Sequence, residues 1–451
     1  MRRRPEPLVW GLLAFIWLLP VHALVIAYLY GGLGWSAGLV RVVAAWKEVL
    51  VVALLTVVLV RAMRGRGTAR GAQWPDLAVA GLAALAVAYL VGAEWWFDQG
   101  LPVAAQLYGW RDAVFASLLY FVGRATPSVA EDPRVPRTLF AVGVVTSAIA
   151  VVERLFVSPG MLVVLGAARY VQEFLGATQI TRGNLYGLPD NYWTTIGDHV
   201  VQRAGSTYLS SQGLAIPFLI ILPAATLWLL SGALRPRVLA WAGYALLWAG
   251  LLLSVTRMTT VACALETLVI VAVRRRWGIA LGLVVTGLAA FAGALFLVPG
   301  LATFFWETLT WQTGSSRGHL ADWGAALANV PAHPLGAGLG SADFVAARFG
   351  VAALAADNQY LKYAVELGLL GVALHVLVLG GVAAAGFHAW RAAATPAQRD
   401  AGLLVGVATL GIALNAVTAV VMNSTLLAYA FYWLAGAVTT VAADSARLER
   451  A

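Results

Sequence analysis

Four charged side chains in this sequence lie at or near the edges of long apolar runs, and each has the chemistry to act on a substrate. They are Arg203, Arg257, Arg317 and Asp357. An ionisable group in or beside a membrane span is costly, so it is a functional candidate by default. A guanidinium offers planar paired donors that fit phosphate oxygens, and a carboxylate can accept a proton. Together the four residues predict a site for a diphosphate with one acid/base group.

Each of the four also has a plainer interpretation. Arg203 stands where residues that anchor a span end or bind lipid head groups are usual, and Arg257 could form a structural ion pair. Arg317 lies in a polar loop, where a solvated charge is ordinary, and Asp357 precedes a predicted helix, where Asp can serve as an N-cap. All four fall near the same predicted membrane surface, and this shared position favours a common site.

The composition excludes a water-soluble protein. Of the 451 residues, 61% are apolar and 11% are charged, against about 45–50% and about 25% in soluble domains. The formal charge is +9, but 28 of the 30 basic residues are Arg, and most of them interrupt apolar runs. This pattern argues against nucleic-acid binding. The single cysteine, Cys263, lies inside an apolar run, and no close His or Cys spacing completes a ligand set, so no disulfide and no metal site are predicted.

Twelve apolar runs are long enough to cross a bilayer as helices, which takes about 20 residues each. They are residues 8–30, 38–60, 75–95, 103–123, 138–158, 208–232, 238–255, 257–273, 277–298, 357–386, 402–422 and 424–443. If Met1 is cytoplasmic, the short inside segments hold 19 of the 30 basic residues, which is the positive-inside pattern. The sequence therefore predicts an all-α polytopic membrane protein, one domain over residues 1–451, with about 12 transmembrane helices and both termini cytoplasmic.

Two long segments remain, residues 159–207 and 299–356, and both are predicted to be periplasmic loops. Within the second, apolar residues recur at spacings of three and four over His319–Val330, which predicts an amphipathic helix on the outer surface. A glycine-rich stretch follows at 331–340 and is expected to be rich in turns. His319 and His333 in this loop are further candidate proton carriers.

Several short motifs, taken in order along residues 200 to 380, resemble the O-antigen ligase and polymerase superfamily. They are Arg203-Ala204-Gly205-Ser206, Ser254-Val255-Thr256-Arg257, Arg317 followed by a helix, His333-Pro334-Leu335-Gly336-Ala337-Gly338-Leu339-Gly340, Asp357-Asn358-Gln359-Tyr360-Leu361 and Glu366-Leu367-Gly368-Leu369-Leu370-Gly371. The resemblance implies an integral inner-membrane enzyme that takes a glycan from undecaprenyl diphosphate on the periplasmic face and passes it to an acceptor. It implies no cofactor, and it assigns Arg203, Arg257 and Arg317 to diphosphate binding.

The chain departs from the family ligases at one position. Those ligases resemble each other in a His-Asn pair, whose His is their proposed catalytic base, where this chain has Asp357-Asn358. Asp-Asn-x-Tyr is more similar to capsule and O-antigen polymerases, and the later Glu-x-Gly-x-x-Gly also resembles the peptidoglycan-polymerising SEDS proteins. A carboxylate can replace an imidazole as base if burial raises its pKa. We therefore expect Asp357 to be the base, with Asn358 and Tyr360 orienting the base or the sugar.

These observations predict a glycosyltransferase that polymerises O-antigen or another surface polysaccharide. Its partners would be an undecaprenyl-diphosphate-linked glycan, a glycan acceptor, membrane lipids and a chain-length regulator. One alternative is an O-antigen ligase that transfers the polymer to lipid A-core. An alternative of another class is a transporter of lipid-linked glycans, although transporters usually carry internal repeats and broken helices that meet at the midplane.

Overall fold

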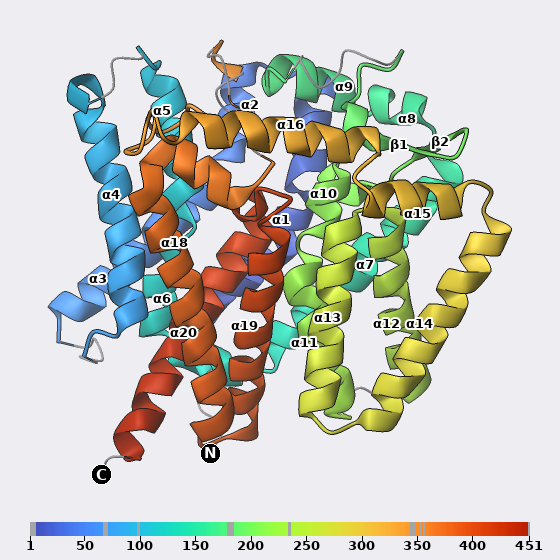
Figure 1. The fold of residues 1–451 in the computed structure, drawn as a ribbon. Helices are drawn as coiled ribbons and strands as arrows, with labels where there is room; N and C mark the ends of the chain where they lie inside the picture. Colours follow the sequence, from blue (N-terminus) through green and yellow to red (C-terminus); the bar gives the residue numbers. More distant parts are fainter. Residues whose placement is uncertain are drawn as a thin grey trace.

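A computed structural model describes residues 6–65, 71–96, 100–177, 185–232, 236–342, 348–350, 354 and 357–449. The described chain is mostly helical, with one small antiparallel hairpin in which Trp193 pairs with Gln202 (Figure 1). The all-α prediction is therefore confirmed.

The first half of the chain, up to the hairpin, contains many helices interrupted by short π- and 3-10 turns. These elements are α1 (Val9–Ala27), η1 (Tyr28–Gly32), α2 (Ala37–Ala44), α3 (Trp46–Met63), α4 (Trp74–Trp96), α5 (Val103–Trp110), η2 (Arg111–Phe115), α6 (Leu119–Ala125), η3 (Pro127–Glu131), α7 (Arg134–Phe156), α8 (Pro159–Val164), α9 (Ala167–Arg169), η4 (Tyr170–Phe174), η6 (Asp190–Tyr192), β1 (Trp193–Ile196) and β2 (His199–Gln202).

The second half is built from longer helices. These elements are η7 (Ser206–Tyr208), α10 (Ser211–Ala215), α11 (Phe218–Leu230), α12 (Arg237–Leu253), α13 (Arg257–Val273), α14 (Trp277–Leu297), α15 (Leu301–Leu309), α16 (Gly314–Asn329), α18 (Gln359–Ala392), α19 (Pro396–Asn415), η8 (Val421–Asn423) and α20 (Thr425–Leu448).

Nine helices of the described chain are long and apolar enough to cross a membrane. They correspond to nine of the twelve predicted runs, so a multi-pass membrane protein is supported. The run 103–123 is divided between α5, η2 and α6, and α12 and α13 have 17 residues each. Whether these three also cross the membrane stays a prediction.

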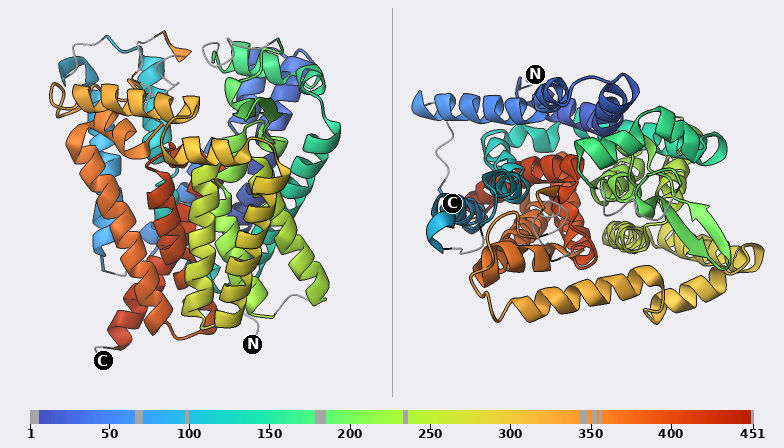
Figure 2. Two further views of the ribbon diagram at one scale, coloured as in Figure 1. Left: turned by 45° about the vertical axis from the view of Figure 1, so that its right-hand side comes forward. Right: turned by 90° about the horizontal axis from the view of Figure 1, so that it is seen from above.

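The first and last described residues lie at one end of the helical bundle, and the described parts of the long segments 159–207 and 299–356 lie at the opposite end (Figures 1 and 2). We call that opposite end the outer end. Helix α16 lies across it, roughly perpendicular to the long helices, which confirms the helix predicted over His319–Val330. At the centre of the bundle, α20 is buried along its whole apolar window.

Backbone contacts between the glycine-rich loop and α18 position the outer end. Helix α18 breaks at Gly368, whose φ of 68° and ψ of −169° are not helical. The exposed backbone groups are met by the loop: Leu369 N–H donates to Pro334 O at 3.0 Å, and Ala337 N–H donates to Val365 O at 2.6 Å. A side chain at Gly336 would collide with the Gly368 nitrogen, 2.6 Å from the added carbon. Glycine is therefore required here by a close backbone approach.

The Glu366 carboxylate holds the same loop from the other side. This side chain is fully buried, and its Oε1 accepts from Gly340 N–H at 3.2 Å. The Glu-Leu-Gly and His-Pro-Leu-Gly motifs are thus two halves of one structural joint, which fixes the end of α16 against the start of α18.

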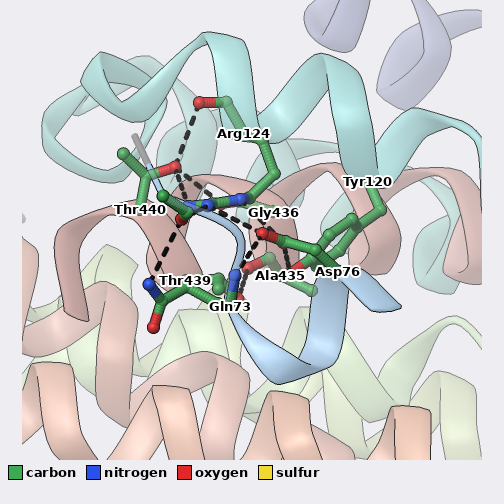
Figure 3. A network of polar contacts seen from close by, with 9 residues as sticks. Gln73, Asp76, Tyr120, Arg124, Ala435, Gly436, Thr439 and Thr440 are labelled. Carbon is green, nitrogen blue, oxygen red and sulfur yellow. Dashed lines mark hydrogen bonds and ion pairs between the residues drawn. The ribbon is translucent and has the colours of Figure 1, made fainter. Parts of the chain in front are cut away.

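A polar network joins α4, α6 and α20 toward the end that carries the termini (Figure 3). Arg124 Nε lies 2.8 Å from Asp76 Oδ1, and its NH1 donates to Thr440 Oγ1 at 2.8 Å. The Tyr120 hydroxyl donates to the same Asp76 oxygen at 2.6 Å. The side chains of Arg124 and Asp76 are only 12% and 13% exposed, so removal of one partner leaves the other with a largely buried charge.

We predict that Arg124→Met destabilises the protein by about 3 kcal/mol, the lower end of the range for breaking a buried ion pair. Thermal unfolding of the purified variant in one detergent measures the change. Arg61→Met is the matched control, because the Arg61–Glu6 pair is more exposed, at 36% and 25%, and its loss should have less than about 1 kcal/mol of effect. Equal transition temperatures for the two variants would contradict the assigned role of Arg124.

Candidate functional site

The turn between α12 and α13 at the outer end holds Arg203. Its Nε donates to the Ser254 carbonyl at 2.9 Å, and its NH2 donates to Thr256 Oγ1 at 3.1 Å. Val255 in this turn has a φ of 50°, unusual for a branched residue. The guanidinium thus meets carbonyl groups left unpaired where α12 ends, a place that favours a cation.

Arg257 begins α13 beside the same turn. Its NH1 donates to Thr308 Oγ1 at 2.5 Å, and its guanidinium carbon lies 5.2 Å from the centre of the Phe304 ring. Both partners belong to α15, in the second long outer segment. Arg257 is therefore half-buried between α13 and α15, and its contacts are a hydroxyl and an aromatic ring.

Arg203 and Arg257 are close enough to repel each other. Burial and, to a smaller extent, the positive charge of Arg257 together lower the pKa of Arg203 to about 10. Both side chains still carry their charge at neutral pH. Within the described chain neither forms an ion pair with a carboxylate, so a bound anion would relieve the repulsion of two partly desolvated cations.

Glu153 positions the segment that carries Arg203, and our sequence reasoning missed it. Its Oε2 accepts from Gly205 N–H at 3.1 Å and from Ser206 N–H at 2.5 Å. Glu153 lies on α7 and is 5% exposed. The signal was available, because a carboxylate inside the predicted span 138–158 needs a partner. Its partners are backbone N–H groups, which sequence does not display.

At the start of α18, the side chains of Asn358 and Tyr360 form hydrogen bonds to the backbone, whereas that of Asp357 is about half exposed. Asn358 is the N-cap, and its Oδ1 accepts from Tyr360 N–H at 2.9 Å, so the capping role considered for Asp357 belongs to its neighbour. The Asn358 amide donates to Val417 O, and the Tyr360 hydroxyl donates to Ala413 O, both at 2.8 Å. These two side chains tie α18 to the end of α19, whereas the Asp357 side chain is 52% exposed.

Asp357 faces His319 of α16. Asp357 Oδ2 lies 3.7 Å from His319 Nδ1, and the histidine side chain is 19% exposed. Trp323 is part of the same surface, with its ring centre 6.2 Å from that of His319. Burial raises the pKa of Asp322, which also faces His319, whereas the histidine acts to lower it. The structure thus brings together two candidate proton carriers that are 38 positions apart in the sequence.

Arg317 lies on α16, and His333 follows the end of that helix. Arg317 is exposed on α16, and within the described chain its guanidinium forms no hydrogen bond or ion pair. Two residues turn a helix by about 200°, so Arg317 and His319 occupy opposite faces. His333 follows the end of α16, where its backbone N–H donates to Asn329 O at 3.0 Å.

Comparison with protein families identifies the segment that carries most of this geometry. Residues 242–376, less than a third of the chain, match the family model described as O-antigen ligase. Over these residues the chain is similar to O-antigen ligases, and we call residues 242–376 the O-antigen ligase domain after that match. The O-antigen ligase domain contains Arg257, His319, Asp357 and the joint between the glycine-rich loop and α18, whereas Arg203 lies before it. The resemblance to this glycan-transferring superfamily is confirmed over the domain. No curated protein matches the chain.

We predict that Glu153→Ala lowers glycan transfer about 10- to 100-fold, because two buried N–H groups lose their acceptor at about 1–3 kcal/mol each and Arg203 moves out of register. The loss should appear as a raised KM for the lipid-linked donor. Glu153→Gln keeps one amide oxygen as acceptor and should recover part of the activity. A Glu153→Ala enzyme with an unchanged donor KM would contradict this positioning role.

Proposed function

We propose that this protein is a glycosyltransferase that moves a glycan from undecaprenyl diphosphate to an acceptor hydroxyl. The observation that carries the proposal is the pair Arg203 and Arg257, held side by side at the outer end with no carboxylate paired to either among the described residues. The O-antigen ligase domain supports a lipid-linked glycan as the ligand that supplies the missing negative charge.

In the proposed reaction, the acceptor oxygen bonds to the anomeric carbon as the bond from that carbon to the diphosphate oxygen breaks. Undecaprenyl diphosphate leaves with the bonding electrons, and negative charge grows on its phosphate oxygens. Arg203 and Arg257 stabilise this charge in a partly desolvated place, where preorganised donors are most effective. Diphosphate binding by Arg317, which is exposed on the face of α16 opposite to His319, stays a prediction.

The acceptor proton passes to the pair formed by Asp357 and His319. Asp357 is the more exposed member, so it meets the acceptor hydroxyl and removes its proton. His319 Nδ1 lies 3.7 Å from Asp357 Oδ2 and is the next acceptor for this proton. Asn358 and Tyr360 fix the backbone on which Asp357 stands.

The proposed location is the bacterial inner membrane, with the outer end facing the periplasm. The preferred acceptor is a growing surface polysaccharide, as the Asp357-Asn358 sequence favours. Transfer to lipid A-core is the second candidate, and the match to the O-antigen ligase family favours it. Both reactions use the same donor site and the same base.

Deletion of the gene separates the two acceptors. For a polymerase, we expect single lipid-linked repeats to accumulate, because the first transfer is blocked. For a ligase, long lipid-linked polymers should accumulate instead. Mass spectrometry of extracted lipid-linked glycans measures both, and an unchanged lipid-linked pool would contradict the proposed function.

We predict that Asp357→Asn and His319→Gln each lower transfer by about 10²-fold or more, as expected when general base catalysis is lost. Asp322→Asn is the matched control, because it removes a carboxylate facing the same histidine without touching the proton path. The measurement is transfer by purified variants given an undecaprenyl-diphosphate glycan, with thermal unfolding as a check on folding. A fully active Asp357→Asn enzyme would remove Asp357 from the acid/base step.

A further inference from the structure

A second group of arginines lies at the outer end and shares no helix or strand with the Arg203–Arg257 pair. Arg41 of α2 has its guanidinium carbon 5.9 Å from the centre of the Phe174 ring. Arg348, from the second long segment, donates from NH2 to Phe174 O at 3.1 Å, and its guanidinium carbon lies 4.8 Å from the Tyr108 ring centre. We call Arg41, Arg348, Tyr108 and Phe174 the Phe174 cluster.

The charges next to the Phe174 cluster are balanced among themselves. Arg111 forms an ion pair with Asp112 at 2.9 Å, and its NH1 is 3.9 Å from Glu48. Lys47 completes this group at 3.2 Å from Glu48. This neighbouring group therefore contains two basic and two acidic side chains, so its net charge is zero and it does not attract an anion.

Glu173, the acidic residue next to Phe174 in the sequence, also forms an ion pair outside the Phe174 cluster. Glu173 pairs with Arg169 at 3.3 Å one helical turn away. The hydrogen bond from Arg169 lowers the pKa of Glu173, so this carboxylate is ionised and is already paired with Arg169. Arg41 and Arg348 are left as two cations that have no ion-pair partner in the described chain.

Aromatic rings hold these cations in place. Two guanidinium carbons lie within 5 Å of the Tyr108 ring centre, that of Arg111 at 4.6 Å and that of Arg348 at 4.8 Å. Phe349 packs on Tyr108 at 5.4 Å, and Tyr170 stacks on Phe174 at 5.8 Å. A ring attracts a guanidinium without consuming its N–H donors. The donors of Arg41 and most of those of Arg348 remain available to a ligand.

We propose that the Phe174 cluster binds an anionic group, phosphate or carboxylate, on the acceptor saccharide. This inference rests on the proposed function, because it gives the acceptor a site separate from the donor's diphosphate. Two guanidiniums beside aromatic rings suit a charged sugar, with the arginines on the anionic group and the rings against its apolar face.

A phospholipid head group is the competing source of the same anionic chemistry. Arg41 alone would suit one, since it is exposed near the start of the second predicted span. Arg348 does not fit this role as well, because it comes from a long loop and is half-buried against Tyr108 and Phe174. The saccharide is therefore the occupant that both arginines favour.

The test measures the binding of a donor analogue and of anionic sugars to the full-length protein in nanodiscs of phosphatidylcholine. Farnesyl diphosphate probes the donor site, and trigalacturonic acid and glucose 6-phosphate probe the carboxylate and phosphate forms of an anionic sugar. Saturation-transfer NMR follows binding, with neutral glucose as the reference. Arg41→Ala and Arg348→Ala should weaken at least one anionic sugar tenfold or more and leave farnesyl diphosphate unchanged. Arg169→Ala, which removes an arginine already paired with Glu173, should change neither.

The two proposals fail in distinguishable ways. If Arg257→Lys does not weaken farnesyl diphosphate, the donor site and the proposed function are wrong. If Arg257→Lys does weaken it but Arg41→Ala and Arg348→Ala leave both anionic sugars unchanged, only the acceptor site is wrong. Nanodiscs with phosphatidylglycerol test for lipid binding. If sugar binding is lost in them, and if Arg348→Ala releases phosphatidylglycerol that co-purifies with the protein, the Phe174 cluster binds lipid and the inference is overturned.

Discussion

The outer end depends on one backbone-to-backbone joint, the insertion of the glycine-rich loop into the break of α18 at Gly368. A helix that breaks inside a membrane protein exposes N–H and C=O groups that lipid cannot satisfy. The loop satisfies them through Pro334 and Ala337, and Glu366 secures its far end. Because α16 leads into this loop and Asp357 precedes α18, the joint fixes His319 and Asp357 relative to each other.

Charge balance separates structural arginines from those proposed to bind substrate. Arg124 is closely matched by Asp76, Tyr120 and Thr440, and nothing in that network calls for a ligand. Arg203 and Arg257 instead contact carbonyls, hydroxyls and a ring, all of them uncharged. A partly buried cation without a counter-charge is unfavourable in isolation, so such sites are suited to an anion that arrives with the substrate.

The sequence predicted those parts of the molecule that follow from composition and local spacing. Apolar runs marked the long helices, and the spacing of Leu320, Trp323 and Leu327 marked α16. In the folded chain Leu320 and Leu327 are exposed, and Ala326 is buried. Glu153 and the contact of His319 with Asp357 were missed, because each joins distant segments through backbone groups or a tertiary approach that no sequence spacing encodes. The N-cap is local, and the sequence analysis considered Asp357 for it, one residue before Asn358.

Helix α14 gives the bilayer itself a structural role. No residue in its apolar window is buried within the protein, so surrounding lipid, more than neighbouring helices, sets its tilt. The chain passes from α14 directly into α15, whose Phe304 and Thr308 contact Arg257. A thinner or thicker hydrocarbon layer would change that tilt and shift these two contacts. The composition of the membrane is thus mechanically connected to the surroundings of one of the two central arginines.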